Sequence, residues 1–112
     1  MPGAPIIRLS GVVPADPEHE AEFNDWYNRY HVPEVCSRIP GIRAGTRYRL
    51  VSPKDVEPRY IVVYELEEGR LTAVDDYLAK QRRGEEPPFT PGPPFKAYFT
   101  HTYQRIISYE RP

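Results

Sequence analysis

The stretch Arg59-Tyr60-Ile61-Val62-Val63-Tyr64-Glu65-Leu66 carries the clearest strand pattern in the chain. Most of its residues are β-branched or aromatic, and these types favour extended backbone. Its apolar residues are almost continuous, which is typical of a central strand that other elements cover. The run from Tyr60 to Tyr64 is also the longest apolar-aromatic run, and it is far too short to cross a bilayer. We therefore predict a central strand here and no membrane association.

Three further strands are predicted on either side of this segment. Ile6 to Val13 is short, rich in β-branched residues and followed by Pro14, and Ile42 to Val51 alternates in polarity. A last strand is expected from about Tyr98 to Tyr109. In the second strand one face carries Ala44, Thr46, Tyr48 and Leu50, and the other carries Arg43, Arg47 and Arg49.

Two helices are predicted between these strands. Asp16 and Pro17 suit the N-cap and first position of a helix, whose buried face would hold Phe23, Trp26, Tyr27 and Tyr30. Pro33 should end this helix near His31, although a short helical piece can restart at Pro33. In the second helix Thr72 and Asp75 have capping-box spacing, and Gly84 is expected to end it.

The element order is therefore β-α-β-β-α-β, which predicts an α+β, ferredoxin-like sandwich in one domain over residues 1–112. Both helices would cover the same face of a four-stranded antiparallel sheet. The other face would be left uncovered, and in so small a chain a second copy usually buries such a face. We expect a homodimer.

Composition excludes several classes of protein. The 15 basic and 16 acidic residues nearly balance, so we expect no binding to nucleic acid or to an anionic membrane. The first residues lack the pattern of a secretion signal, and the single cysteine, Cys36, cannot form an internal disulfide, which suits the cytoplasm. Five of the 14 prolines lie between Glu86 and Phe95. Because this loop, residues 85–97, also carries Phe89 and Phe95, we expect an ordered flap.

Three short motifs resemble a known family. Phe23-Asn24-Asp25-Trp26-Tyr27-Asn28, then His31-Val32-Pro33, then Ile39-Pro40-Gly41 resemble the first-helix signature of small dimeric α/β-barrel proteins, and are most similar to the EthD-like branch. The resemblance implies a homodimer with a ligand pocket in each subunit between the sheet and the helices. Relatives include cofactor-free monooxygenases, lactone isomerases, polyketide cyclases and haem-degrading enzymes, so the resemblance does not define a reaction.

His31 is the strongest catalytic candidate. At a helix C-terminus the imidazole would be favoured in its protonated form, which suits acid-base chemistry near neutral pH. Tyr27 and Asn28 would share its side of the helix. The alternative is a histidine that caps the last carbonyl groups and does no chemistry.

Other candidates each have a structural alternative. Asn28 with Tyr48 or Tyr64 could hold a carbonyl or phenolate oxygen of a substrate. Trp26 and Tyr27 could wall an aromatic pocket, or they could be core residues. His101 could be a second acid-base group or could lie in a dimer interface, which we favour. The candidates for substrate binding are Trp26, Tyr27, Phe89, Phe95 and His101.

No metal site or cofactor is predicted, because no two histidines have ligand spacing and phosphate-binding glycine motifs are absent. Haem binding through His31 or His101 remains open by family analogy only. The arginines of the second strand would form a solvated stripe, or would bind a substrate carboxylate.

Together these patterns favour a cofactor-independent enzyme that uses His31 as general acid-base on a small aromatic or polyketide-like substrate. Cyclisation, isomerisation or dehydration would be its chemistry, with ring oxygenation as a variant. Phe89 and Phe95 would close the pocket. The alternative is a non-catalytic dimer that carries a small hydrophobic ligand.

Overall fold

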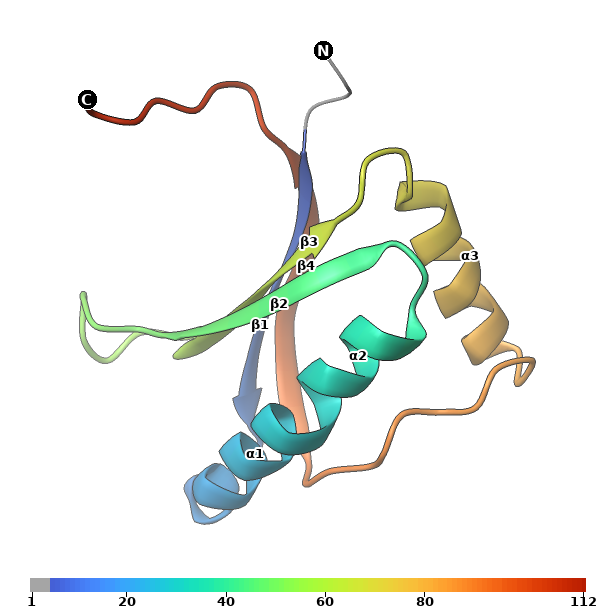
Figure 1. Ribbon diagram of the computed structural model, residues 1–112. Helices are drawn as coiled ribbons and strands as arrows, with labels where there is room; N and C mark the ends of the chain where they lie inside the picture. The colour runs from blue at the N-terminus through green and yellow to red at the C-terminus, as the bar shows by residue number, and fades with distance from the viewer. Residues whose placement is uncertain (1–4) are drawn as a thin grey trace.

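Four strands form one antiparallel sheet in the computed structural model, which describes residues 5–112. The strands are β1 (Ile6–Pro14), β2 (Ile42–Arg49), β3 (Tyr60–Leu66) and β4 (Phe95–Gln104). Their spatial order is β2-β3-β1-β4, so β3 lies inside the sheet between β2 and β1 (Figure 1). The prediction of a central strand at this position is confirmed.

The helices all cover the same face of this sheet (Figure 1). A 3-10 turn (Pro17–His19), α1 (Glu20–Trp26), a π-helical turn (Tyr27–His31) and α2 (Val32–Arg38) follow one another without a break, and α3 (Leu71–Arg82) follows β3. The chain is therefore an α+β fold of the ferredoxin-like type, as predicted. We call the sheet face that no described helix covers the open face.

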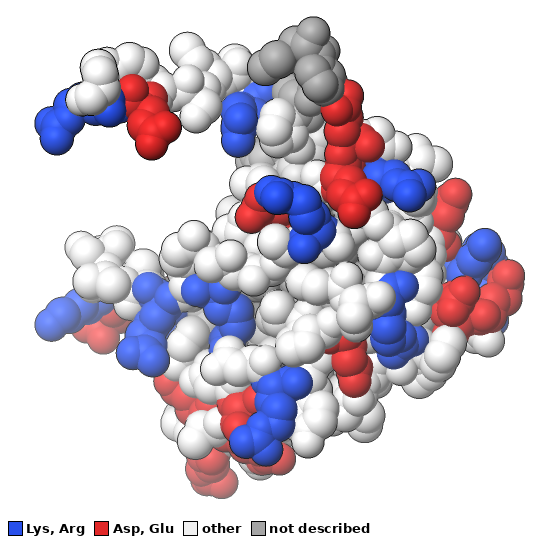
Figure 2. All heavy atoms as spheres, in the orientation of Figure 1, with Lys and Arg blue, Asp and Glu red and all other residues white. Residues whose placement is uncertain are grey.

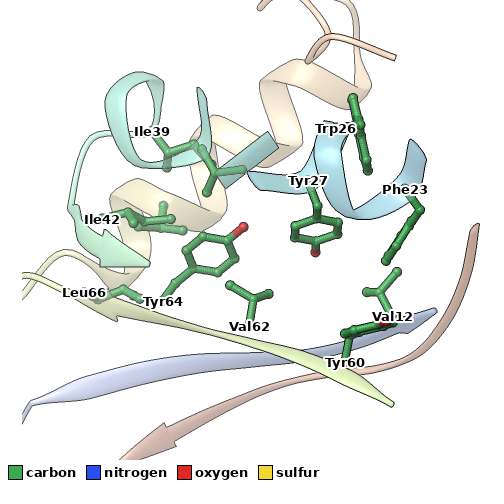
Figure 3. Packing of buried hydrophobic residues seen from close by; sticks show 12 residues of the cluster. Val12, Phe23, Trp26, Tyr27, Ile39, Ile42, Tyr60, Val62, Tyr64 and Leu66 are labelled. Atoms are coloured by element: carbon green, nitrogen blue, oxygen red, sulfur yellow. The ribbon is translucent and has the colours of Figure 1, made fainter. Parts of the chain in front are cut away.

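The core lies between the sheet and the helices. Alternate residues of β3 are buried there, namely Tyr60, Val62, Tyr64 and Leu66. Phe23 packs onto them from α1 and Tyr27 from the π-helical turn (Figure 3), and Trp26 of α1 joins the same cluster through Phe23 and Tyr27. Since burying a large apolar side chain contributes roughly 1.5–3 kcal/mol, this aromatic layer holds the helical segment against β3.

The first helical segment does not end near His31, contrary to the prediction. The backbone N–H of Val32 donates to the carbonyl of Tyr27, five residues earlier, which makes a wide π-helical turn. Pro33 then occupies the first turn of α2, where its missing N–H costs little. Helical backbone therefore continues to Arg38, and His31 lies inside the helical segment.

Several element boundaries also differ from the predictions. Asp16 does not cap a helix with its side chain, which instead bonds the His19 imidazole at 2.6 Å. Helix α3 begins at Leu71 rather than at a Thr72 cap, and Asp75 pairs with Arg8 of β1.

Strand β4 starts at Phe95, inside the predicted flap, and ends at Gln104 rather than near Tyr109. Gln104 pairs with Ile6, the first residue of β1. After one more backbone bond, from Arg105 N–H to the Pro5 carbonyl, no β1 residue remains to continue the ladder. The described end of β4 therefore lies opposite the start of β1.

The surface carries mixed charge. Figure 2 shows basic and acidic side chains interspersed over the viewed face, which agrees with a net charge of −1. Between residues 5 and 112 no helix has the length and apolarity that a membrane crossing requires.

Candidate functional site

The imidazole of His31 is enclosed by three aromatic rings. It stacks on Trp26 with ring centroids 4.9 Å apart, and the rings of Tyr27 and Phe89 meet it edge-on at 4.9 and 5.4 Å. Its Nδ1 atom is buried, and no group in residues 5–112 hydrogen-bonds to it. The three rings thus shield much of the imidazole from water, and its buried Nδ1 atom is left without a hydrogen-bond partner.

Burial lowers the pKa of His31 below its usual value of 6.5. The nearby Glu34 carboxylate opposes this shift, and the positive charge of Arg47 adds to it. The expected helix C-terminus, which would have favoured the protonated ring, is not there. At neutral pH the imidazole is therefore neutral and able to accept a proton.

Tyr64 presents a second buried polar atom without a partner. No group in the described part of the chain hydrogen-bonds to its hydroxyl oxygen. Figure 3 shows the hydroxyls of Tyr27 and Tyr64 turned into the same space between β3 and the helical segment. Burial raises the pKa of Tyr27 to about 12, and burial with the neighbouring Tyr27 phenol raises that of Tyr64 as well. Both phenols therefore stay protonated at neutral pH.

Arg47 lies on the helix-covered side of β2, which corrects the expectation of a solvated arginine stripe. Its half-buried guanidinium sits 4.5 Å from the ring centroid of Tyr27. It donates to Asn28 Oδ1 at 2.7 Å and to Asn24 Oδ1 at 3.0 Å. No carboxylate forms an ion pair with it in residues 5–112. The groups that accept its hydrogen bonds there are neutral amide oxygens.

A surface hollow of about 280 Å³ opens beside this guanidinium. Its lining residues are Asn24, Asn28, Arg47, Tyr48, Arg49 and Tyr60. We call it the Arg47 hollow. Asn28 lies here rather than beside His31, and the ring of Tyr27 contacts both the Arg47 guanidinium and the His31 imidazole. The Tyr27 ring therefore lies between the Arg47 hollow and the His31 imidazole.

The loop of residues 85–97 covers the His31 side of the site, and hydrogen bonds hold it in place. Glu34 of α2 accepts from the Thr90 backbone N–H at 2.7 Å and from the Thr90 hydroxyl. Trp26 Nε1 donates to the Thr90 carbonyl at 2.9 Å, and Arg38 donates to the carbonyls of Pro87 and Pro88. The expectation of an ordered flap is confirmed.

Close packing of this loop depends on a glycine. A Cβ atom at Gly92 would stand 2.2 Å from the indole of Trp26, so any larger residue would push the loop away. At the end of the loop Phe95 stacks on the same indole with centroids 6.1 Å apart. Phe95 therefore covers the Trp26 indole directly, whereas Phe89 contacts the His31 ring that stacks on this indole.

Two candidates lie on the open face and not beside His31. Tyr48 pairs with Ile61 across β2 and β3, is 55% exposed, and also borders the Arg47 hollow. His101 of β4 pairs with Leu9 and stacks on Phe99 at 5.1 Å. The structure therefore brings together His31, Trp26, Tyr27 and Phe89, places Tyr64 beside Tyr27, and places Tyr48 and His101 away from the imidazole.

Residues 5–112 contain no group of three His, Cys, Asp or Glu side chains that could hold a metal ion.

Three residues of this site escaped sequence analysis: Arg47 as a helix-facing group, and Glu34 and Thr90 as the pair that holds the loop. One signal for Arg47 was present. Gly45 has the same strand parity as Arg47, and a Cβ there would stand 2.9 Å from Val32 and 3.0 Å from Tyr64. A glycine at such a position indicates close approach of another element, so this face is the covered one. Nothing in the sequence joins Glu34 to Thr90.

Comparisons with known proteins support the fold. No family model matches the chain, and no curated protein matches it in sequence. A "putative monooxygenase" from Shewanella loihica PV-4 matches with a TM-score of 0.59 and 14% identity over 95% of this chain and 98% of its own. HapK from Hahella chejuensis matches with a TM-score of 0.53 and 13% identity over 96% and 99%. At these identities the likeness establishes a shared fold alone.

Proposed function

We propose that the protein is a cofactor-independent enzyme that acts on a small aromatic or polyketide-like substrate, with His31 as general acid-base. One observation carries the proposal: Nδ1 of His31 and the hydroxyl oxygen of Tyr64 are both buried without a partner in residues 5–112. Leaving a buried polar group unpaired costs about 1–3 kcal/mol. Folds rarely keep two such groups unless a ligand completes them.

The chemistry begins with the neutral imidazole. Because burial lowers the pKa of His31, the ring can take a proton from a phenol or from a carbon next to a carbonyl group at neutral pH. It can return the same proton to a leaving oxygen. This order of proton transfers serves cyclisation, isomerisation and dehydration alike.

Tyr64 and Arg47 would stabilise the negative charge that proton removal creates. The Tyr64 hydroxyl stays protonated and can donate a hydrogen bond to a carbonyl or phenolate oxygen. The charge of Arg47 lowers the pKa values of the Tyr27 and Tyr64 phenols, which means that it favours negative charge on oxygen at this place. Asn28 would contribute through its bond to Arg47.

The loop of residues 85–97 would act as a lid. Phe89 covers the imidazole, so a substrate that reaches His31 must displace this ring and then be covered by it. Exclusion of water would strengthen each interaction in the site. Ring oxygenation is the variant reaction, and the name of the Shewanella loihica relative agrees with it.

Membership of the EthD-like branch belongs to the same proposal. The motifs between Phe23 and Gly41 support it, since they supply both Trp26 and His31 of the site. The structures of the two relatives support only the ferredoxin-like fold that this branch shares.

We also propose a homodimer formed through the open face. Large apolar side chains are exposed on or beside it, including Tyr48, Tyr98 and Tyr103 at 55%, 41% and 48%. Figure 2 shows the surface hollowed between the C-terminal segment and the β2–β3 connection, where a cavity of about 260 Å³ lies over Ile7, Val63 and Thr46. A second copy packed here would bury this surface.

The test is turnover by His31 variants. Hydroxynaphthalenes and aromatic β-diketones would be screened with the purified protein for a change in absorbance or mass. For a substrate so found, His31→Gln should lower kcat by about 10²–10⁴-fold. His19→Gln, which removes an exposed imidazole paired with Asp16, is the matched control and should have no effect. Turnover that survives in His31→Ala would overturn the catalytic assignment.

A non-catalytic carrier is the second candidate function, and the stacking of Trp26 on both Phe95 and His31 favours it, because such rings suit a flat hydrophobic ligand. In this case ligands of the same panel bind, none is converted, and His31→Gln changes affinity but no reaction.

A further inference from the structure

We propose that the Arg47 hollow binds the carboxylate of a small aromatic acid and so selects the substrate. The inference rests on the proposed function in one respect, namely that this acid is the molecule on which His31 acts. Four features of the hollow carry it: an unbalanced charge, a rigidly held donor fork, a free amide donor and aromatic walls.

The charge of Arg47 has no counter-ion in the described chain. On the same strand Arg43 forms an ion pair with Glu65. Arg59, the residue before β3, forms ion pairs with Glu20 and Glu57. Arg49, which also lines the hollow, likewise forms no ion pair in residues 5–112. A half-buried guanidinium loses part of its hydration, and an anion that reaches it is attracted more strongly than in open water.

A chain of hydrogen bonds holds the guanidinium fork in place. Glu20 accepts from Arg59 and from the Tyr60 hydroxyl, both at 2.6 Å. Tyr60 in turn accepts from Asn24 Nδ2 at 3.1 Å, which turns Asn24 Oδ1 toward Arg47. This network also occupies the carboxylate closest to the hollow. The fork is therefore preorganised, and the Glu20 charge is already neutralised.

Asn28 supplies a further donor. A guanidinium only donates hydrogen bonds, so the amide oxygen of Asn28 must be the atom that faces Arg47. Its amide nitrogen is left without an acceptor in residues 5–112, at an exposed position that lines the hollow. The two N–H groups of the Asn28 amide, beside the planar guanidinium of Arg47, match the two oxygens of a carboxylate.

Size and lining favour a one- or two-ring acid. The volume of about 280 Å³ is close to the lower end of ordinary ligand sites. Tyr48 lines the hollow, is 55% exposed, and offers a flat surface to an aromatic ring. Arg49 is a second cation in the lining, and the planar fork of Arg47 matches the geometry of a planar carboxylate.

The experiment compares 2-naphthoate with its neutral isostere 2-naphthamide by isothermal titration calorimetry. Naphthoate should bind at least about tenfold more tightly than the amide. Asn28→Asp is the decisive variant, because the introduced carboxylate would form an ion pair with Arg47 and so take the place of the ligand's carboxylate. It should keep or raise Tm while weakening naphthoate binding by about tenfold or more.

Arg47→Gln should lose the same binding, and Arg43→Gln, on the same strand but paired with Glu65, should bind naphthoate as the wild type does. Equal affinities for naphthoate and naphthamide would overturn the proposal, as would unchanged naphthoate binding in Asn28→Asp. Tighter binding of inorganic phosphate than of naphthoate would overturn the carboxylate assignment.

This test is separate from that of the proposed function. His31→Gln should lower kcat by about 10²–10⁴-fold while naphthoate affinity stays within about twofold of the wild type. If naphthoate binds but no acid is turned over, the carboxylate site at the Arg47 hollow stands and the proposed enzymatic function is rejected. If only uncharged substrates are turned over, the enzymatic function stands and the carboxylate site is rejected.

Discussion

The imidazole of His31 stacks on the indole of Trp26 at a centroid distance of 4.9 Å and an interplanar angle of 28°. Trp26 is the last residue of α1 and His31 the last of the π-helical turn, so they are five residues apart. An ordinary α-helix aligns residues three or four apart. The π-helical turn places the histidine over the indole instead, under the loop of residues 85–97. Local backbone geometry thus removes His31 from water.

The first prediction concerns pH and His31. The unfolded imidazole takes up a proton as pH falls through 6.5, whereas the folded one, whose pKa is lowered, does so only at lower pH. The free energy of unfolding should therefore fall as pH decreases below 6.5. Denaturant titrations between about pH 5 and pH 8 should show this slope in the wild type and its loss in His31→Gln.

His19 provides the control for this slope, because hydrogen bonding to Asp16 raises its pKa and its contribution has the opposite sign. Stability from His19 is present below its unfolded pKa and is lost as pH rises through the folded value. A His31→Gln variant with an unchanged slope would contradict the assignment of the acid loss to His31.

The second prediction compares two tyrosines of β3. Tyr64→Phe removes a buried hydroxyl that has no partner in residues 5–112, so it should stabilise the protein by about 1 kcal/mol. Tyr60→Phe removes a hydroxyl that accepts from Asn24 and donates to Glu20, and should cost about 1–2 kcal/mol. Thermal unfolding of both variants measures the difference. Loss of turnover in a stabilised Tyr64→Phe protein would identify a functional hydroxyl.

The third prediction concerns the bond between Glu34 and Thr90. Hydrogen bonding from Thr90 holds the pKa of Glu34 below its usual value, so the carboxylate is charged at neutral pH. Glu34→Gln weakens these charge-assisted bonds by about 1 kcal/mol, which should speed amide exchange at Phe89 and Thr90 roughly fivefold.

Glu85→Gln is the matched control, because Glu85 pairs with Arg83 and does not contact Thr90 in any bond described here. It should leave amide exchange at Phe89 and Thr90 unchanged. Equal acceleration in the two variants would mean that Glu34 does not hold the loop.

The fourth prediction concerns the open face. Val63 lies on it, since its neighbours Val62 and Tyr64 face the core. Val63→Glu should convert the proposed homodimer to a monomer, because a dimer interface would bury the new charge without a partner. Light scattering after size-exclusion chromatography measures the mass. Thr72→Glu, on exposed α3 surface, should leave the mass unchanged, and a wild type that is already monomeric would refute the dimer.

Much of the fold was predictable because it depends on short-range patterns. β-Branched residues predicted the strand at 60–66 and its central place. The ring spacing predicted a buried helix face that is confirmed for Phe23, Trp26 and Tyr27, but was wrong for Tyr30, which is 42% exposed because the π-helical turn shifts the spacing after Tyr27. The failures were also local in origin. A proline near His31 predicted a helix end, but a π-helical turn accommodates Pro33 without a break.

The sequence by itself determined the element order and the ferredoxin-like topology, since periodicity and residue type carry that information. Only the tertiary structure decided which faces meet. Covering one side of β2 with the helical segment makes Arg47 a half-buried cation and leaves Tyr48 on the other side. Covering His31 with Phe89 lowers its pKa. Desolvation depends on contacts between residues far apart in the chain, and these arise only when the chain folds.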